Sequence, residues 1–406
     1  MTTTTWHDQL RSEAFKTYEA TAWPARNHEN WRFGSFKKAR FEDLPLAKEG
    51  ESTQAAHLLE NSLRFVFQNH ELVERPDSLP AGLTALPLSE ALQEFGDCLE
   101  KKFPKLQGSL GSAKLAAYHR AHAPEALVLL ATADIETPVE IIHQISGHEQ
   151  IVLPHLLITS DEGGHLRVVE RFISTNENDA TRVVSVTDVV AEKNSQVTYL
   201  ATQELNRHSL FTRLADSRVE QNALGRIGVV HTGAEWVREE TYSTVDGTDG
   251  RSEILSVAIP DTGQEYDQRT FQHHGARDTF SDLLFKNTLF GEAKTVFSGL
   301  IFVDEHAHGT DAYQTCRNLL MTDTCEANSM PGLEINADEV KCSHGSTSSQ
   351  VSKEEIYYLM ARGIPATQAR RLIAKGFSVE VIQKLDNEAL EELAIAIVEA
   401  KFAQVG

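Results

Sequence analysis

The chain has 406 residues, with 59 acidic against 38 basic side chains and a formal net charge of −21. This charge argues against nucleic acid or an anionic membrane surface as a partner. No apolar run approaches the roughly 20 residues of a membrane span. The first residues (MTTTTWHDQL) lack the basic-then-apolar pattern of a secretory signal. Four cysteines in so long a chain do not indicate a disulfide framework, so we expect reduced thiols and a cytoplasmic protein.

Residues 1–110 are predicted to form an N-terminal region of helices and irregular segments. Ser89–Lys102 begins with a residue typical of a helix N-cap, and it places Leu92, Phe95 and Leu99 on one stripe before Pro104. The preceding stretch is interrupted by the prolines Pro24, Pro45, Pro76, Pro80 and Pro87. We interpret it as loops around short helices.

Residues 111–348 are predicted to form a mainly β core. Short apolar runs rich in β-branched residues recur there: Leu127–Leu130, Val139–Ile145, Ile151–Ile158, Leu166–Val169, Arg182–Val190, Val197–Leu200, Ile254–Ile259 and Thr295–Val303. Turn signals such as 161–164 (DEGG) and 246–250 (DGTDG) separate them, and long helical patterns are missing, which argues against a βαβ sheet. A sandwich and a stacked β-solenoid remain. The loosely regular spacing and the lack of Asn-Gly hairpin signals favour the solenoid.

Residues 349–406 are predicted to form a C-terminal helical domain. Ser352 begins a capping box, and Ile356, Leu359 and Met360 form the apolar stripe of the first helix, which Gly363 ends. Further helices are expected over Thr367–Lys375, Val379–Leu385 and Asn387 to about Ala403. Such a pack of helices is either a surface for docking a partner or a cap that shields the last solenoid coil.

The sequence Cys342-Ser343-His344-Gly345 stands at the boundary between the strand-rich core and the helical tail. Side chains at i and i+2 of a strand leave the same face, so the thiol and the imidazole would point to one spot. Sulfur beside nitrogen suits iron, an iron–sulfur cluster, zinc or copper. The alternative is a hydrogen-bonded histidine beside a small buried thiol.

Two other histidine pairs are candidates for metal binding. His306 and His308 lie among Asp304, Glu305 and Asp311, and they form either an H-x-H metal pair or a solvated turn.

The second pair, His273-His274, lies near Asp278 and Asp282. Neighbouring strand residues face opposite ways, so at most one of these two histidines can join a given site. The motifs G-x-S-x-G, H-E-x-x-H, C-x-x-C and G-x-x-x-x-G-K-[ST] are all missing from the sequence. We therefore predict no nucleotide site on this chain.

Several motifs together resemble the SufB/SufD family of iron–sulfur cluster assembly proteins. The C-S-H-G of 342–345 followed by 357–364 (YYLMARGI) is similar to the family's C-S-H-G-A-T…F-Y-L-R-S-R-G-I signature. Further similar segments are 310–314 (TDAYQ), 318–321 (NLLM), 331–335 (PGLEI) and 337–340 (ADEV), so the resemblance covers roughly residues 110–380. The early 29–33 (ENWRF) is similar to the W-R-[FY] element of the SufD branch. Cys316, however, stands where SufB carries its cluster-building cysteine, which leaves a SufB-like scaffold open.

This resemblance implies a right-handed parallel β-helix between N- and C-terminal helical regions. It also implies a scaffold without catalytic activity that pairs its β-helix with SufB and docks the ATPase SufC through the C-terminal domain. The chain would bind no nucleotide itself and could form a homodimer in isolation. Transient iron or a nascent cluster would lie at the SufB interface. The residues implied for metal are His344, Cys342 and Cys316, and those implied for docking are Glu355, Tyr358, Arg362 and Gly363.

Two further function classes remain open. A carbohydrate-active β-helix enzyme would use acidic pairs on the solenoid face, and no paired-carboxylate strand motif is evident. A purely structural β-helix would carry no metal. Co-purification of SufB and SufC with brown colour distinguishes the scaffold from both.

Overall fold

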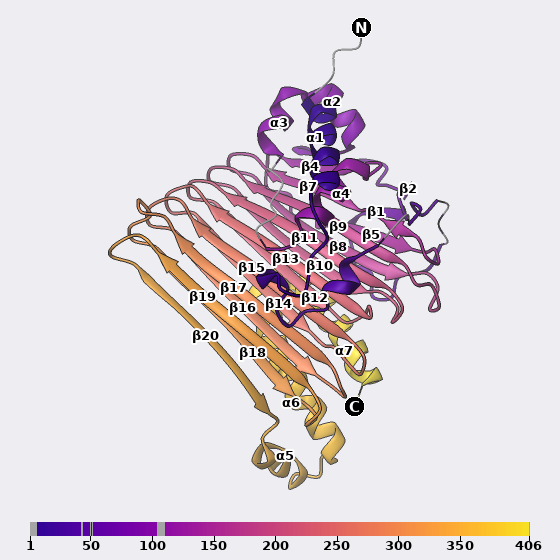
Figure 1. Ribbon diagram of the computed structural model, residues 1–406, viewed down its shortest axis with the longest axis vertical. Coiled ribbons are helices and arrows are strands. Elements are labelled where there is room, and N and C mark those ends of the chain that lie inside the picture. The colour runs from indigo at the N-terminus through magenta and orange to yellow at the C-terminus, as the bar shows by residue number, and fades with distance from the viewer. Residues whose placement is uncertain (1–5, 42–43, 49, 51, 104–109, 406) are drawn as a thin grey trace.

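The computed structural model describes residues 6–405 apart from 42–43, 49, 51 and 104–109. It is a β-solenoid of about 8 turns with helices towards both ends of the chain (Figure 1), which confirms the predicted fold class. Among the described residues, no helix combines the length and the apolar character that crossing a membrane requires.

Two ten-stranded sheets run along the solenoid. Sheet B contains, in spatial order, β2 (Glu71–Glu74), β1 (Leu63–Gln68), β5 (Val139–Ile145), β8 (His165–Ser174), β10 (Gln196–Glu204), β12 (Leu224–His231), β14 (Arg251–Ala258), β16 (Phe280–Leu289), β18 (Asp311–Leu320) and β20 (Lys341–Gln350). Sheet A contains β19 (Glu326–Ile335), β17 (Lys294–Val303), β15 (Glu265–His274), β13 (Trp236–Val245), β11 (Leu210–Val219), β9 (Arg182–Ala191), β7 (His155–Ser160), β4 (Leu127–Ala131) and β3 (Leu83–Pro87), with β6 (Ile151–Val152) beside β9. The pairs β1–β2 and β3–β4 are antiparallel, and the other pairs are parallel.

A repeated corner turns the chain into sheet B. The residue two positions before each sheet B strand from β8 to β20 has a positive φ, and these residues are Gly163, Asn194, Asn222, Asp249, Asp278, Gly309 and Glu339. Glycine, asparagine and aspartate adopt the left-handed conformation most readily, and six of these seven corners have one of them. The corner therefore fixes the same change of direction in successive coils.

The N-terminal region combines helices with the first strands of both sheets. Its helices are α1 (Trp6–Ala20), η1 (Glu29–Trp31), η2 (Phe36–Ala39), α2 (Leu88–Phe95), α3 (Asp97–Lys102) and α4 (Ala113–His122). The single helix predicted over 89–102 is wrong, because Gly96 has a φ of +42° and divides it. Ser89 is not its N-cap either: Pro87 is, and the Ser89 hydroxyl donates to Glu125 at 2.6 Å.

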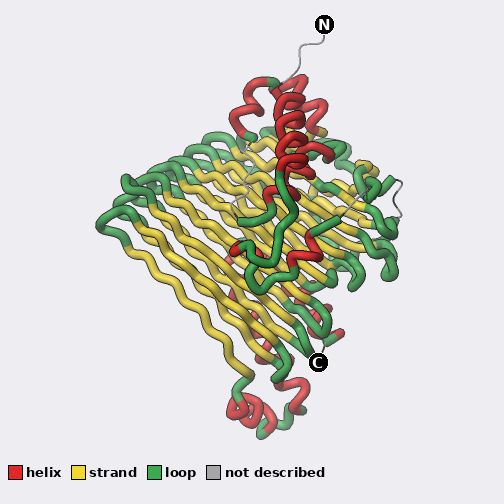
Figure 2. The backbone as a smooth tube through the Cα atoms, in the orientation of Figure 1, coloured by secondary structure: helices red, strands yellow, loops and turns green. Residues whose placement is uncertain are grey.

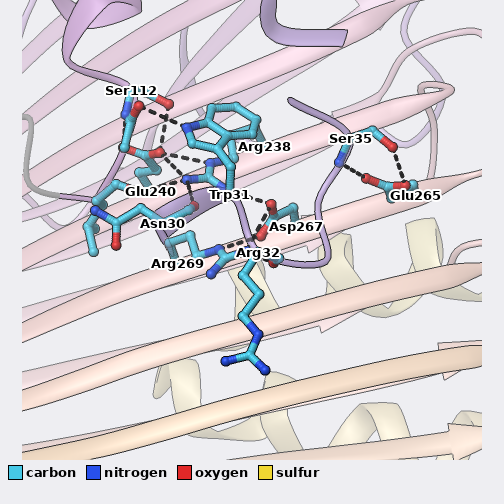
Figure 3. Close-up of polar contacts among 12 residues, drawn as sticks. Asn30, Trp31, Arg32, Ser35, Ser112, Arg238, Glu240, Glu265, Asp267 and Arg269 are labelled. Atoms are coloured by element: carbon cyan, nitrogen blue, oxygen red, sulfur yellow. Dashed lines mark hydrogen bonds and ion pairs between the residues drawn. The ribbon is translucent and has the colours of Figure 1, made fainter. Parts of the chain in front are cut away.

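The segment around Trp31 is fastened to the outer face of sheet A (Figure 3). The buried Trp31 ring stacks on Trp236, with centroids 6.2 Å apart, and the Arg238 guanidinium lies 4.0 Å from the Trp31 ring. Arg238 also donates to the backbone oxygen of Asn30 at 2.9 Å and to Asp267 at 2.5 Å. This network joins the N-terminal arm to β13 and β15.

The C-terminal helices are α5 (Lys353–Met360), α6 (Ala366–Ile382), η3 (Gln383–Leu385) and α7 (Glu388–Gln404). The two short helices predicted over 367–375 and 379–385 are wrong, because α6 is unbroken from Ala366 to Ile382 and η3 follows it directly. The predicted caps are present: the Ser352 side chain accepts from Glu355 N, and Asn387 Oδ1 accepts from Leu390 N. Gly363, at φ +86°, ends α5 with its N–H on Met360 O and the N–H of Ile364 on Leu359 O.

These helices cover the outer face of sheet B and not the end of the solenoid (Figure 2). Apolar side chains of α6 and η3 pack against β12, β14 and β16 through Val381, Ile382 and Leu385. The buried Lys286 of β16 pairs with Glu380, and its ammonium lies 4.5 Å from the Phe377 ring centroid. The last coil, β19 and β20, is therefore open at its far end.

Candidate functional site

The C-S-H-G motif lies on β20, the outermost strand of sheet B (Figure 1). Cys342 pairs with Ala312 of β18, and His344 pairs with Gln314. Ala312 and Gln314 are buried in the solenoid interior, so Cys342 and His344 share the inward-facing side of the strand. The sequence spacing predicted this shared face.

The motif is accessible because no further coil covers it. His344 is exposed and Cys342 is half-buried, whereas the equivalent positions of β18 are buried. A Cβ added at Gly345 would meet nothing within 4 Å. An incoming group can therefore reach the imidazole directly.

Cys316 lies on the same face, one strand further inside. It pairs with Ser346 of β20 and has Ser329 Oγ of β19 at 3.8 Å and Asn318 Oδ1 at 3.9 Å. Burial raises the pKa of the Cys316 thiol to about 12. It is protonated at neutral pH, and a thiol is a poor metal ligand compared with a thiolate. The present conformation thus keeps Cys316 out of the accessible site.

The different burial of the cysteines predicts their reactivity. Cys98 is exposed and Cys316 is buried, so iodoacetamide near neutral pH should alkylate Cys98 at least ~100-fold faster, because only an accessible thiolate attacks. Peptide mass spectrometry at timed intervals measures both rates, and denatured protein is the control in which the two should react similarly. Equal rates in the native protein would show that the solenoid end opens readily.

Of the two potential ligands, the Cys342 thiol is expected to be weaker than the His344 imidazole. Its partial burial raises its pKa, and the hydrogen bond with the backbone of Ala312 opposes that rise. Within the part of the chain that the structure describes, no group of three or more His, Cys, Asp or Glu side chains could hold a metal ion. Cys342 and His344 can thus supply two ligands, and a metal or cluster would need the others from another molecule.

The other histidine candidates are not brought together. His306 is 85% exposed on a turn beside Glu305, while His308 Nδ1 lies 3.1 Å from Asp338 O. His273 and His274 do face opposite ways, as predicted. His273 pairs with Asp304 on the outside, at 2.9 Å, and His274 is buried inside.

A second surface lies on the C-terminal helices. The residues implied for docking, Glu355, Tyr358, Arg362 and Gly363, are all exposed, and the Arg362 guanidinium lies 3.5 Å from the Tyr358 ring centroid. Sequence reasoning placed Met360 on the buried stripe, but it is 48% exposed. It also missed the exposed Tyr357 and Leu372. Tyr357, Tyr358 and Met360 lie within one turn of α5, and we call these exposed side chains the apolar patch on α5.

Both edges of the last coil are free as well. β19 ends sheet A and β20 ends sheet B, and neither strand has a further neighbour among the described residues. An edge strand presents unpaired N–H and C=O groups, which can pair with a strand of another chain. The open coil therefore combines two potential ligands with two edges suited to adding strands.

The structure is thus a β-solenoid whose open last coil carries Cys342 and His344 and whose sheet B carries a helical domain. The family model of the SUF system FeS cluster assembly SufBD core domain matches residues 143–377. The chain belongs to this SufBD family.

Curated relatives carry the SufD name. The chain is 28% identical over 385 residues to the iron-sulfur cluster assembly protein SufD of Escherichia coli, covering 93% of this chain and 88% of that protein. It is 25% identical over 418 residues to SufD of Bacillus subtilis, covering 98% and 94%. A SufBD family protein of Mycobacterium tuberculosis, Rv1462, is 27% identical over 329 residues, covering 78% and 82%.

Proposed function

We propose that this chain is a SufD-like scaffold without catalytic activity in a cytoplasmic complex that builds iron–sulfur clusters. In this complex His344 and Cys342 bind iron or a nascent cluster, which is the cargo, together with ligands of a SufB-type subunit. The observation that carries the proposal is the open last coil, where the imidazole and the thiol share one accessible face. Neutral imidazole completes a coordination sphere and releases a cluster more readily than a second thiolate does.

The edges of β19 and β20 supply the docking surface for the SufB-type subunit. Strand addition at these edges would bring a second solenoid end against Cys342 and His344, and its side chains would complete the ligand set. In isolation, the same edges would allow a homodimer.

Anaerobic co-purification tests this function directly. The chain is co-expressed with SufB- and SufC-type proteins, and we expect a ternary complex with brown colour after iron and sulfide are supplied. A chain that binds neither partner and remains colourless would contradict the proposal. Turnover of a polysaccharide by the chain alone would support the carbohydrate-active alternative instead.

The apolar patch on α5 is the proposed contact for a SufC-type ATPase. Tyr357 is 73% exposed and Tyr358 is 57% exposed, and aromatic side chains contribute strongly to protein interfaces. Nucleotide-driven dimerisation of the ATPase would then pull on α5 and α6. Because α6 packs on β14 and β16, that pull would be transmitted to the strands beside the open coil.

The double variant Glu355→Lys/Arg362→Glu should bind the ATPase about tenfold more weakly, because one charge on α5 and one just after it are reversed and the Arg362–Tyr358 contact is lost. Calorimetric titration with the isolated ATPase measures the change. Glu392→Lys, an exposed charge reversal on α7, is the matched control and should bind normally. Equal affinities for the unmodified chain, the double variant and Glu392→Lys would show that the ATPase does not bind at α5.

A further inference from the structure

A small cavity lined by basic side chains lies between the N-terminal helices and the first coils of the solenoid. Its volume is about 150 Å³. His7 and Arg11 of α1, Arg120 of α4 and His155 of β7 line it, while the apolar walls come from Leu88, Leu92 and Phe103. Four basic side chains therefore converge on one cavity of a protein whose net charge is −21.

Three carboxylates lie near these four basic side chains, and only one of them, Glu125, lines the cavity. Asp188 of β9 accepts from His155 Nε2 at 3.0 Å and lies 3.9 Å from Arg120 Nη2. Asp8, on α1, acts on His7 from an exposed position.

The carboxylate of Glu125, which lines the cavity, is hydrogen-bonded to groups at the start of α2 and to the neighbouring backbone. It accepts from Ser89 N at 3.2 Å, from the Ser89 hydroxyl at 2.6 Å and from Ala126 N at 3.0 Å. These three hydrogen bonds hold the Glu125 carboxylate against Ser89 and Ala126, while Asp188 is shared by His155 and Arg120.

The pKa values of two histidines at this cavity are lowered, mainly by burial and also by neighbouring basic groups. Burial lowers the pKa of His7, and the neighbouring Arg11 and His155 lower it further. His119, behind the cavity, donates from Nε2 to Pro154 O at 2.9 Å, and its Nδ1 has no hydrogen-bond partner among the described residues. Burial, and then His155, lower the pKa of His119 too. A negative charge inside the cavity would relieve this repulsion.

We infer that this cavity binds a single small tetrahedral oxyanion, inorganic phosphate or sulfate. The arginine and histidine N–H groups would donate to its oxygens, and guanidinium groups bind such anions strongly. At ~30 Å³ for each water, the cavity holds roughly five waters, which leaves room for one oxyanion.

Such an anion would tie α1 to the solenoid body. Arg11 donates to Ala121 O at 3.0 Å, and the Lys114 ammonium donates to Tyr18 O at 2.8 Å, so α1 is fixed mainly to α4. An oxyanion held by His7 and Arg11 on one side and by Arg120 and His155 on the other would add a link to β7. Because it binds the folded state, it would also raise the melting temperature as its concentration increases.

Titration of the full chain with sulfate, and separately with phosphate, tests the inference by calorimetry at low ionic strength. We expect one saturable site for each anion. Arg11→Gln should weaken binding about tenfold, because a charge-assisted hydrogen bond is lost. Arg26→Gln, which removes the same charge from an exposed position, should leave the affinity unchanged.

Sulfate keeps its charge between pH 6 and 8, the ordinary titration range of histidine, so it isolates the contribution of the histidines. Its affinity should rise as the pH falls, and His7→Gln should reduce that dependence. Melting curves in anion-free buffer show whether each variant is folded. If only one of Arg11→Gln and His7→Gln is folded, that variant is sufficient for the test. Absence of saturable binding, or equal affinities for Arg11→Gln and Arg26→Gln, would overturn the inference.

Discussion

His344→Ala is expected to abolish the build-up of an iron–sulfur cluster in the complex while leaving the complex itself assembled. The side chain is exposed on the inward face of β20, and it is one of two potential ligands at the open coil. Its removal leaves the fold and both edge strands unchanged, because no packed neighbour depends on an exposed side chain. The proposed coordination sphere, however, would lose one of the two ligands that this chain supplies.

Visible absorption and iron content of the anaerobically reconstituted complex measure this loss. His306→Ala is the matched control, since it removes an 85% exposed histidine from a nearby turn of the same solenoid. Cys342→Ser should reduce the cluster content less, because the raised thiol pKa makes Cys342 the weaker ligand at neutral pH. Full cluster content in His344→Ala would refute the proposed role.

Part of the site could be predicted from local periodicity alone. The strand period of two places Cys342 and His344 on one face, and the structure has them there. Their exposure depends on where the stack of coils ends, which no local pattern reports. The burial of Cys316 has the same origin, because β18 is covered by one more strand and β20 is not.

The sequence contains a further signal of the solenoid, besides the apolar runs from which the fold class was predicted. Asn194, Asn222, Asp249 and Asp278 occupy the same left-handed corner of successive coils, two positions before a strand. Aligning these residues would have fixed the length of the coil and the number of strands. The apolar runs could not do so, because many inward positions are polar, such as Gln314.

The predicted helix boundaries were wrong where tertiary contacts outweigh local helix propensity. Gly376 interrupts the pattern of α6 and costs a helix about 1 kcal/mol relative to alanine. The helix nevertheless continues, because Phe377 lies over the Lys286 ammonium and the next turn packs on sheet B. These contacts join residues about 90 positions apart, as in the Lys286–Glu380 pair with a separation of 94. A local pattern does not contain that information.

Trp31→Ala is expected to lower the free energy of opening the N-terminal arm by about 3–5 kcal/mol, the usual cost of removing a buried tryptophan. The ring is 2% exposed, and Trp31 Nε1 donates to Gly111 O at 3.0 Å. It covers the Arg238–Asp267 pair, so its loss also admits water to a buried ion network. Solenoid coils interact mainly with their neighbours, and the effect should therefore stay within the arm and the strands beneath it.

Hydrogen exchange of residues 29–39 and of β13 resolves this local effect, and tryptic cleavage at Arg32 gives a second measure of opening. Phe33→Ala is the control: Phe33 is two residues further along the same arm but 43% exposed, so its loss should change the opening free energy by no more than about 0.5–1 kcal/mol. If both variants exchange and cleave at the same rate as the unmodified chain, the arm is held by its backbone contacts to Arg238 and Arg269 and not by the tryptophan. Faster exchange in Trp31→Ala alone would establish the W-R-F element as the anchor that fixes the arm on sheet A.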